Sequence, residues 1–146
     1  MDVYLASGNA HKLEEFQDML HHAGIGLNLY SPEEVGGMPD VDDTGDTFEE
    51  NALLKALGLV ERVPEGSWVL ADDSGLMVDA LDGKPGVHSS RFAGPAGNAT
   101  ANNLKLMHEL TGVPAGKRTA RFTCVLVFMQ KDGETHLFEG SCEGSI

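Results

Sequence analysis

Two adjacent carboxylates and a hydroxyl follow an apolar run in the segment Asp72-Asp73-Ser74-Gly75. The run, residues 68–71, predicts a strand that is buried on both faces and ends at the two acids. In open α/β sheets, ligands bind outside the carboxyl ends of such strands. Adjacent carboxylates repel unless a proton or a cation separates them, and Mg²⁺ combines one or two carboxylates with phosphate oxygens and water. The segment therefore predicts magnesium-dependent phosphate chemistry.

The two acids cannot do the same job in a regular strand, because successive side chains point to opposite faces. We expect one of them to face a metal ion and its water, and the other to accept backbone N–H bonds from the loop. Gly75 would then permit a sharp turn. The alternative is a strand-end turn in which both acids bond only to nearby backbone.

A second candidate site lies at residues 7–12, between a predicted strand at residues 3–6 and a helix at residues 11–22. A glycine turn that opens a helix directs backbone N–H groups at one place, and the helix dipole adds about half a positive charge there. The pattern is not a P-loop. The alternative is an asparagine cap followed by an exposed lysine. If the segment binds phosphate, the loop would comprise Ser7, Gly8, Asn9, Ala10, His11 and Lys12, and the residues alone leave both readings open.

A third candidate is the helix that opens at Thr47, where a threonine followed three residues later by Glu50 fits a capping box. Asn51 and Lys55 are four residues apart and share a helix face, so Lys55 could reach a phosphate. The alternative is a solvated face with ordinary charge pairing. The acidic loop before this helix could add a second metal ligand.

A fourth candidate is the glycine-rich loop at residues 83–97, which carries basic side chains that include Arg91. Such a loop near a carboxylate cluster could hold a polyphosphate tail. The loop has one histidine, His88, and a lone histidine more often has a structural role than a catalytic one.

Further strands are expected at residues 27–30, 120–130 and 135–141, and further helices at residues 47–62 and 98–111. Helices alternate with the early strands, and a hairpin closes the chain. The expected fold class is α/β, with a mixed central β-sheet flanked by helices in a single domain over residues 1–146.

Composition excludes several classes of protein. The 146 residues carry a net charge of −13, which leaves no electrostatic footprint for nucleic acid. No apolar run approaches the roughly 18 residues of a membrane span, and we expect no membrane partner. Two cysteines are too few for a disulfide framework. With no signal-peptide pattern at the start, we expect a cytoplasmic location.

Together these segments resemble the inosine triphosphate pyrophosphatases, which remove deaminated nucleotides from the nucleotide pool. The resemblance is carried by three motifs and extends more weakly through "ARFTCVLVF". The motifs are "LASGNAHKLEEF", "TGDTFEENALLKA" and "ADDSGLMVDALDGKPGVHSSRFAG".

The resemblance implies hydrolysis of ITP, dITP and XTP between the α- and β-phosphates, with Mg²⁺ as cofactor and a homodimer as the assembly. It implies an elongated two-lobed fold with the active site in the cleft. Residues 7–12 would bind the triphosphate, Lys55 would contact phosphate and Ser74 would contact substrate. Asp73 would accept the proton and bind the metal, with Asp72 beside it as a further metal ligand. The family's usual glutamate ligand is replaced here by Asp43, whose shorter side chain would reach the metal through water.

Family members continue into "FGYDP" and "SHR" segments that grip the base and sugar, and neither occurs in this chain. We therefore expect the domain to lack its C-terminal base-recognition segment. Two alternatives follow: a weakly active or inactive member that binds nucleotide or dimerises, and a related hydrolase of modified pyrimidine triphosphates.

Overall fold

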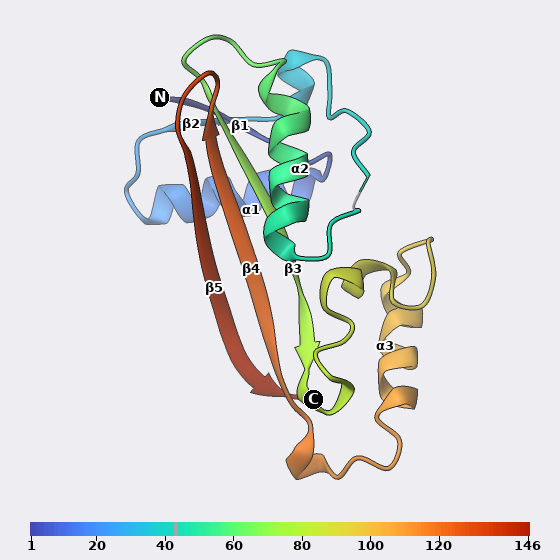
Figure 1. Cartoon of the computed structure of the whole chain (residues 1–146). Coiled ribbons are helices and arrows are strands. Elements are labelled where there is room, and N and C mark those ends of the chain that lie inside the picture. Colours follow the sequence, from blue (N-terminus) through green and yellow to red (C-terminus); the bar gives the residue numbers. More distant parts are fainter. Residues whose placement is uncertain (43) are drawn as a thin grey trace. The chain divides into compact units, whose positions relative to one another are not determined.

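The computed structural model describes residues 1–42 and 44–146. Five strands form one sheet in the order β2-β1-β3-β4-β5 (Figure 1). The strands are β1 Asp2–Leu5, β2 Asn28–Tyr30, β3 Trp68–Val78, β4 Thr119–Gln130 and β5 Thr135–Ser145. The helices are α1 Ala10–His22, α2 Phe48–Val60 and α3 Ala99–Glu109.

The expected α/β class with a mixed sheet is confirmed. Strand β1 pairs in parallel with both β2 and β3, and β4 runs opposite to β3 (Figure 1). The chain visits β1, α1, β2, α2 and β3 in turn, so β1 lies where the strand order reverses. Crevices at such a reversal, outside the carboxyl ends of the strands, are where open α/β sheets bind ligands.

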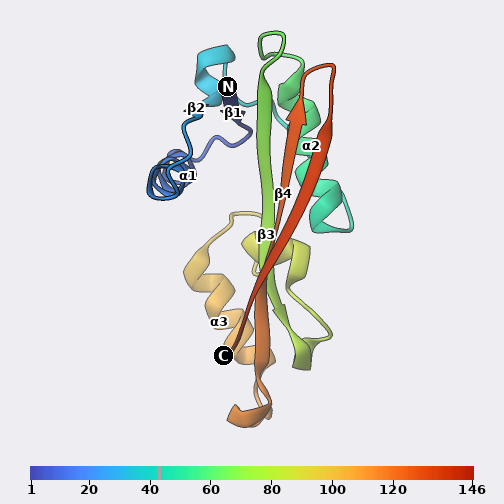
Figure 2. The same cartoon turned by 90° about the vertical axis from the view of Figure 1, so that its left-hand side faces the viewer.

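The chain forms two compact units. The first contains residues 1–72 and 126–138, and the second contains residues 73–125 and 139–146. In the first unit, α1 and α2 lie on opposite sides of the sheet (Figure 2). The face toward α1 packs Phe16 and Leu20 against Val3, Leu5 and a group of sheet residues, Leu29, Trp68, Leu70 and Phe128. Helix α1 is thus held by an apolar face of the sheet.

The second unit has its own apolar core. Val78, Leu106, Leu110 and Ala120 are buried together, and Phe92 packs against them. These residues come from β3, α3, the turn after α3, and β4, so α3 is held against this end of the two strands. None of the described helices combines the length and the apolar composition that a membrane span requires.

The boundaries of several elements agree closely with the sequence pattern. Thr47 caps α2 by accepting the N–H of Glu50, and Asn98 caps α3 by accepting the N–H of Ala101. Short 3-10 helices at Pro32–Val35 and Gly86–Arg91 lie within segments expected to be loops. Strand β5 continues to Ser145, four residues beyond its expected end.

The expected end of the strand at the two acids is wrong. Strand β3 continues through Asp72, Asp73, Ser74 and Gly75 to Val78, so Gly75 makes no sharp turn. Strand β4, twelve residues long, is hydrogen-bonded to β3 and supports the longer strand. The alternative of a strand-end turn is wrong for the same reason.

The second core predicts a clear contrast between two leucines. Leu110 is fully buried, whereas Leu104 on α3 is 68% exposed. Leu110→Ala should lower the free energy of unfolding by about 2–5 kcal/mol, because it leaves a cavity. Leu104→Ala, the control, should change it by less than about 0.5 kcal/mol. Urea unfolding followed by circular dichroism measures both, and equal effects would contradict the assignment of this core.

Candidate active site

The end of β1 places the first candidate loop beside the middle of β3. Leu5 is in register with Leu70, and the Ala6 N–H donates to the Leu70 carbonyl at 2.8 Å. The chain then leaves the sheet through residues 7–9 and enters α1 at Ala10. The start of α1 therefore lies close to Asp72, two residues beyond Leu70.

The ammonium group of Lys12 contacts the carboxylate of Asp72. Its Nζ lies 3.1 Å from both Oδ1 and Oδ2 of Asp72. The Asp72 side chain is 8% exposed and that of Lys12 is 33% exposed. A carboxylate this far out of water needs a partner, and Lys12 provides it. The ion pair is buried on the carboxylate side and open to solvent on the lysine side.

Lys55 contacts the same strand residue through the main chain. Its Nζ donates to the Asp72 carbonyl oxygen at 3.1 Å. Lys55 lies on α2, whereas Lys12 lies on α1, and these helices are on opposite sides of the sheet (Figure 2). Two cations of a strongly acidic chain thus meet at one residue of β3. A clustered positive charge of this kind suits a polyphosphate.

The loop before α1 is folded by its own side chains. Ser7 Oγ accepts the N–H of Asn9 at 3.1 Å, and Asn9 Oδ1 accepts the N–H of His11 at 2.9 Å. The asparagine cap expected as an alternative is therefore present, but Lys12 is paired rather than simply exposed. The N–H groups of Ala10 and Lys12 have no partner within the helix, as at any α-helix start.

The start of α2 is fastened to the preceding loop by a buried amide. Asn51 is 2% exposed, and its Oδ1 accepts the Gly45 N–H at 2.8 Å. Glu50 Oε2 accepts the Asp46 N–H at 2.9 Å, one residue earlier than in a standard capping box. These contacts fix the helix that carries Lys55. The sequence placed Asn51 on the lysine's face but did not reveal this role, because it depends on the fold of the loop.

Three predicted site residues, Asp73, Ser74 and Arg91, belong to the second unit. Asp73 is partly buried, and Ser74 and Arg91 are exposed. The Arg91 segment is held by two residues that sequence reasoning missed. Ser89 Oγ accepts the Leu76 N–H at 2.9 Å, and Asn102 Oδ1 accepts the Ala93 N–H at 2.7 Å. No sequence motif identifies either bond, because each partner is at least nine residues away.

The structure thus brings together Lys12, Lys55 and Asp72, and residues 7–11 directly precede Lys12 along the chain. The predicted metal ligand Asp43 lies outside the described residues. Asp72 and Asp73 are consecutive in β3, so their side chains leave opposite faces of the strand. They cannot play equivalent roles, as the sequence indicated.

Magnesium fits the kind of oxygen donor that β3 offers. Within residues 1–42 and 44–146, no three His, Cys, Asp or Glu side chains gather into a metal cage. Mg²⁺ in nucleotide enzymes takes one or two carboxylates and completes its shell with phosphate oxygens. Asp73 offers a partly buried carboxylate of this kind. Both oxygens of Asp72, in contrast, already accept hydrogen bonds from Lys12.

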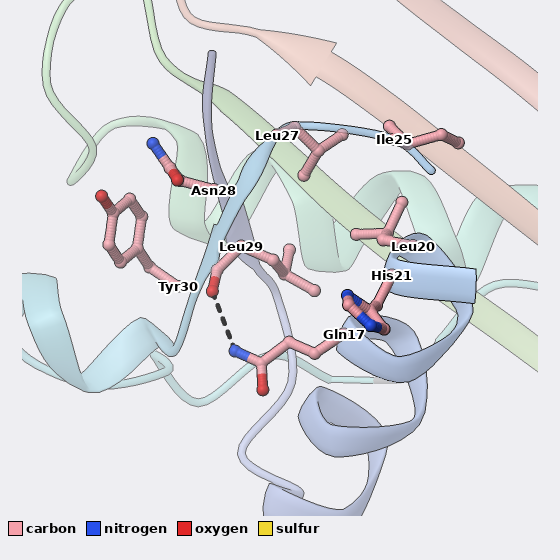
Figure 3. A pocket seen from close by; sticks show the side chains of 8 residues that line it. All are labelled: Gln17, Leu20, His21, Ile25, Leu27, Asn28, Leu29 and Tyr30. Atoms are coloured by element: carbon pink, nitrogen blue, oxygen red, sulfur yellow. Dashed lines mark hydrogen bonds between the residues drawn. The ribbon is translucent and has the colours of Figure 1, made fainter. Parts of the chain in front are cut away.

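A pocket elsewhere in the first unit has a different lining. It encloses about 350 Å³ between α1 and β2, and Gln17 donates to the Leu29 carbonyl at its wall (Figure 3). His21, Asn28 and Tyr30 contribute polar groups, but Lys12, Lys55 and Asp72 do not line it. The candidate active site is therefore separate from this pocket.

Comparison with known proteins identifies the family. The model of the Ham1 family matches residues 3–146, and the chain belongs to this family. A dITP/XTP pyrophosphatase of Opitutus terrae is 46% identical, covering 100% of this chain and 74% of that protein. A dITP/XTP pyrophosphatase of Xanthomonas oryzae is 51% identical, covering 99% of this chain and 71% of that protein.

Solved structures agree with the family and the fold. The Ham1 protein of Staphylococcus aureus superposes with a TM-score of 0.84 at 36% identity, over 100% of this chain and 72% of that one. A HAM1 protein of Coxiella burnetii gives a TM-score of 0.87 at 34% identity, over 100% of this chain and 73% of that one. The chain therefore spans nearly three quarters of the length of these relatives.

The Asn51 contact predicts that a residue with a side chain at position 45 destabilises the protein. A Cβ at Gly45 would lie 2.7 Å from Asn51 Oδ1 and 2.7 Å from Glu50 Cβ. Gly45→Ala should lower the free energy of unfolding by about 1–3 kcal/mol, as overpacking does. Gly26→Ala, whose Cβ would meet nothing within 4 Å, is the matched control. Thermal melts of the two variants compare them, and an unchanged Gly45→Ala melt would show that the loop is not clamped.

Proposed function

We propose that this chain hydrolyses deaminated purine nucleoside triphosphates, ITP, dITP and XTP, to the nucleoside monophosphate and pyrophosphate. The observation that carries the proposal is the meeting of Lys12 and Lys55 at Asp72. The support from relatives is identity of 46–51% with dITP/XTP pyrophosphatases along essentially the whole chain. In this reading, residues 1–146 form one catalytic domain.

The lysines would stabilise the negative charge of the triphosphate. Phosphoryl transfer needs little covalent help from a protein and depends on positioning and on charge neutralisation. Lys12 and Lys55 supply two positive charges, and the α1 N-terminus adds its partial charge. Residues 7–11 would line the phosphates, and Ser74 and Arg91 would contact substrate. We propose these contacts from the motifs that carry the family resemblance.

Asp73 would act as the base. The oxygen of a water molecule attacks the α-phosphorus, and a proton of this water passes to the Asp73 carboxylate. The bond from the α-phosphorus to the oxygen that bridges to the β-phosphate breaks. The leaving pyrophosphate keeps the electron pair of that bond. Magnesium would be held by Asp73, with Asp43 as a second ligand, and when bound it would neutralise phosphate oxygens and acidify a coordinated water. The homodimer, the two-lobed shape and the cytoplasmic location stay predictions.

The reaction class is tested with the chain itself. With Mg²⁺ and dITP, we expect the products dIMP and pyrophosphate in equal amounts, separated by anion-exchange chromatography. Addition of EDTA should stop the reaction, because the phosphate charge is then not neutralised. No pyrophosphate above the buffer control, together with a higher melting temperature on adding dITP, would contradict hydrolysis and support a nucleotide-binding member.

Replacement of the proposed base tests its role. Asp73→Asn should lower kcat by about 100-fold or more, since general-base catalysis contributes roughly that factor. Asp132→Asn is the matched control, because it removes the same charge at an exposed turn whose left-handed backbone asparagine tolerates. Full turnover by Asp73→Asn would remove this residue from the chemical step.

A further inference from the structure

Asp72 is contacted by two lysines through two different groups. Lys12 Nζ lies 3.1 Å from each carboxylate oxygen, and Lys55 Nζ lies 3.1 Å from the main-chain carbonyl oxygen. The side chain therefore binds one lysine, and the backbone of the same residue binds the other. This arrangement brings the ends of two long, flexible side chains to one residue of β3.

The exposure of the ion pair is unequal, and this inequality matters for function. The Asp72 side chain is 8% exposed, whereas that of Lys12 is 33% exposed. An ammonium group has three donors, so the two bonds to Asp72 leave one for a ligand. A buried carboxylate without its cation is costly, which keeps Lys12 in place when no ligand is bound. The lysine is thus ordered in advance and still open to solvent.

We propose that Asp72 is a positioning residue that orders Lys12 and Lys55 for a polyphosphate, and that it does not bind the metal ion. The inference rests on the proposed function only in taking the polyphosphate to be that of a nucleotide. Asp72 touches neither the phosphorus nor the attacking water. Ordering the lysines beforehand lowers the entropy cost of binding the phosphate chain.

The test measures binding of inorganic tripolyphosphate in EDTA, so that metal and hydrolysis play no part. Isothermal titration calorimetry compares the unchanged chain with Asp72→Asn, which keeps the shape and the main-chain carbonyl but loses the charge. We expect Asp72→Asn to raise the Kd about tenfold, the effect of one charge-assisted hydrogen bond. Asp18→Asn, an exposed acid on α1, makes the same charge change and should stay within about twofold.

Binding to Asp72→Asn that equals or exceeds that of the unchanged chain would overturn the inference, because the carboxylate would then be neutral or a competitor. Absence of tripolyphosphate binding to the unchanged chain would overturn it as well. If dITP is not hydrolysed but the Kd values for tripolyphosphate are as expected, only the proposed function is contradicted. The two ideas therefore fail separately.

A second measurement covers the case in which Asp72→Asn does not fold. In the unchanged chain, reductive methylation followed by mass spectrometry should modify Lys12 more slowly than the exposed Lys117. Metal-free tripolyphosphate should then slow the modification of Lys12 and Lys55 further, and leave Lys117 unchanged. Equal rates at Lys12 and Lys117 would show that Asp72 does not hold the lysine, and would overturn the inference.

Discussion

The structure of the site depends on a carboxylate that is buried in the middle of a strand. Asp72 lies on β3, and its charge is matched by Lys12 at the start of α1. Because a buried charge without a partner is costly, the start of α1 has to stay against β3. The reversal of strand order at β1 makes this contact possible, since it sends the loop after β1 past Asp72. Fold and charge pairing therefore support each other at the place where an α/β sheet binds ligands.

Much of the fold could be predicted from local signals. The capping residue Thr47 marked the start of α2, and the helices expected at residues 11–22 and 98–111 lie close to the observed α1 and α3. The continuation of β3 past Asp72 could not be predicted, because adjacent acids normally end a buried strand. What allows it is tertiary structure: the long partner strand β4 and the lysine of another element. Local patterns did not show the division into two units either, since β3, β4 and β5 contribute to both.

The candidate site was predicted in its residue types but not in its pairings. The sequence singled out Lys12, Lys55 and Asp72 separately, and the structure shows that they meet. Asp72 was predicted beside the metal, yet both of its oxygens accept hydrogen bonds from Lys12. Asn51 was placed on the same helix face as Lys55, and the structure shows that it binds the Gly45 N–H. Such contacts span up to 60 residues of chain, and no periodic pattern encodes them.

The most direct test of the central claim is a crystal structure of this chain with Mg²⁺ and a non-hydrolysable dITP analogue. The account predicts phosphate oxygens within hydrogen-bond distance of Lys12 Nζ and Lys55 Nζ, an Asp72 carboxylate still bound to Lys12, and a metal ion on Asp73. A nucleotide whose phosphates contact neither lysine, or a metal ion coordinated by Asp72 in place of Lys12, would contradict it.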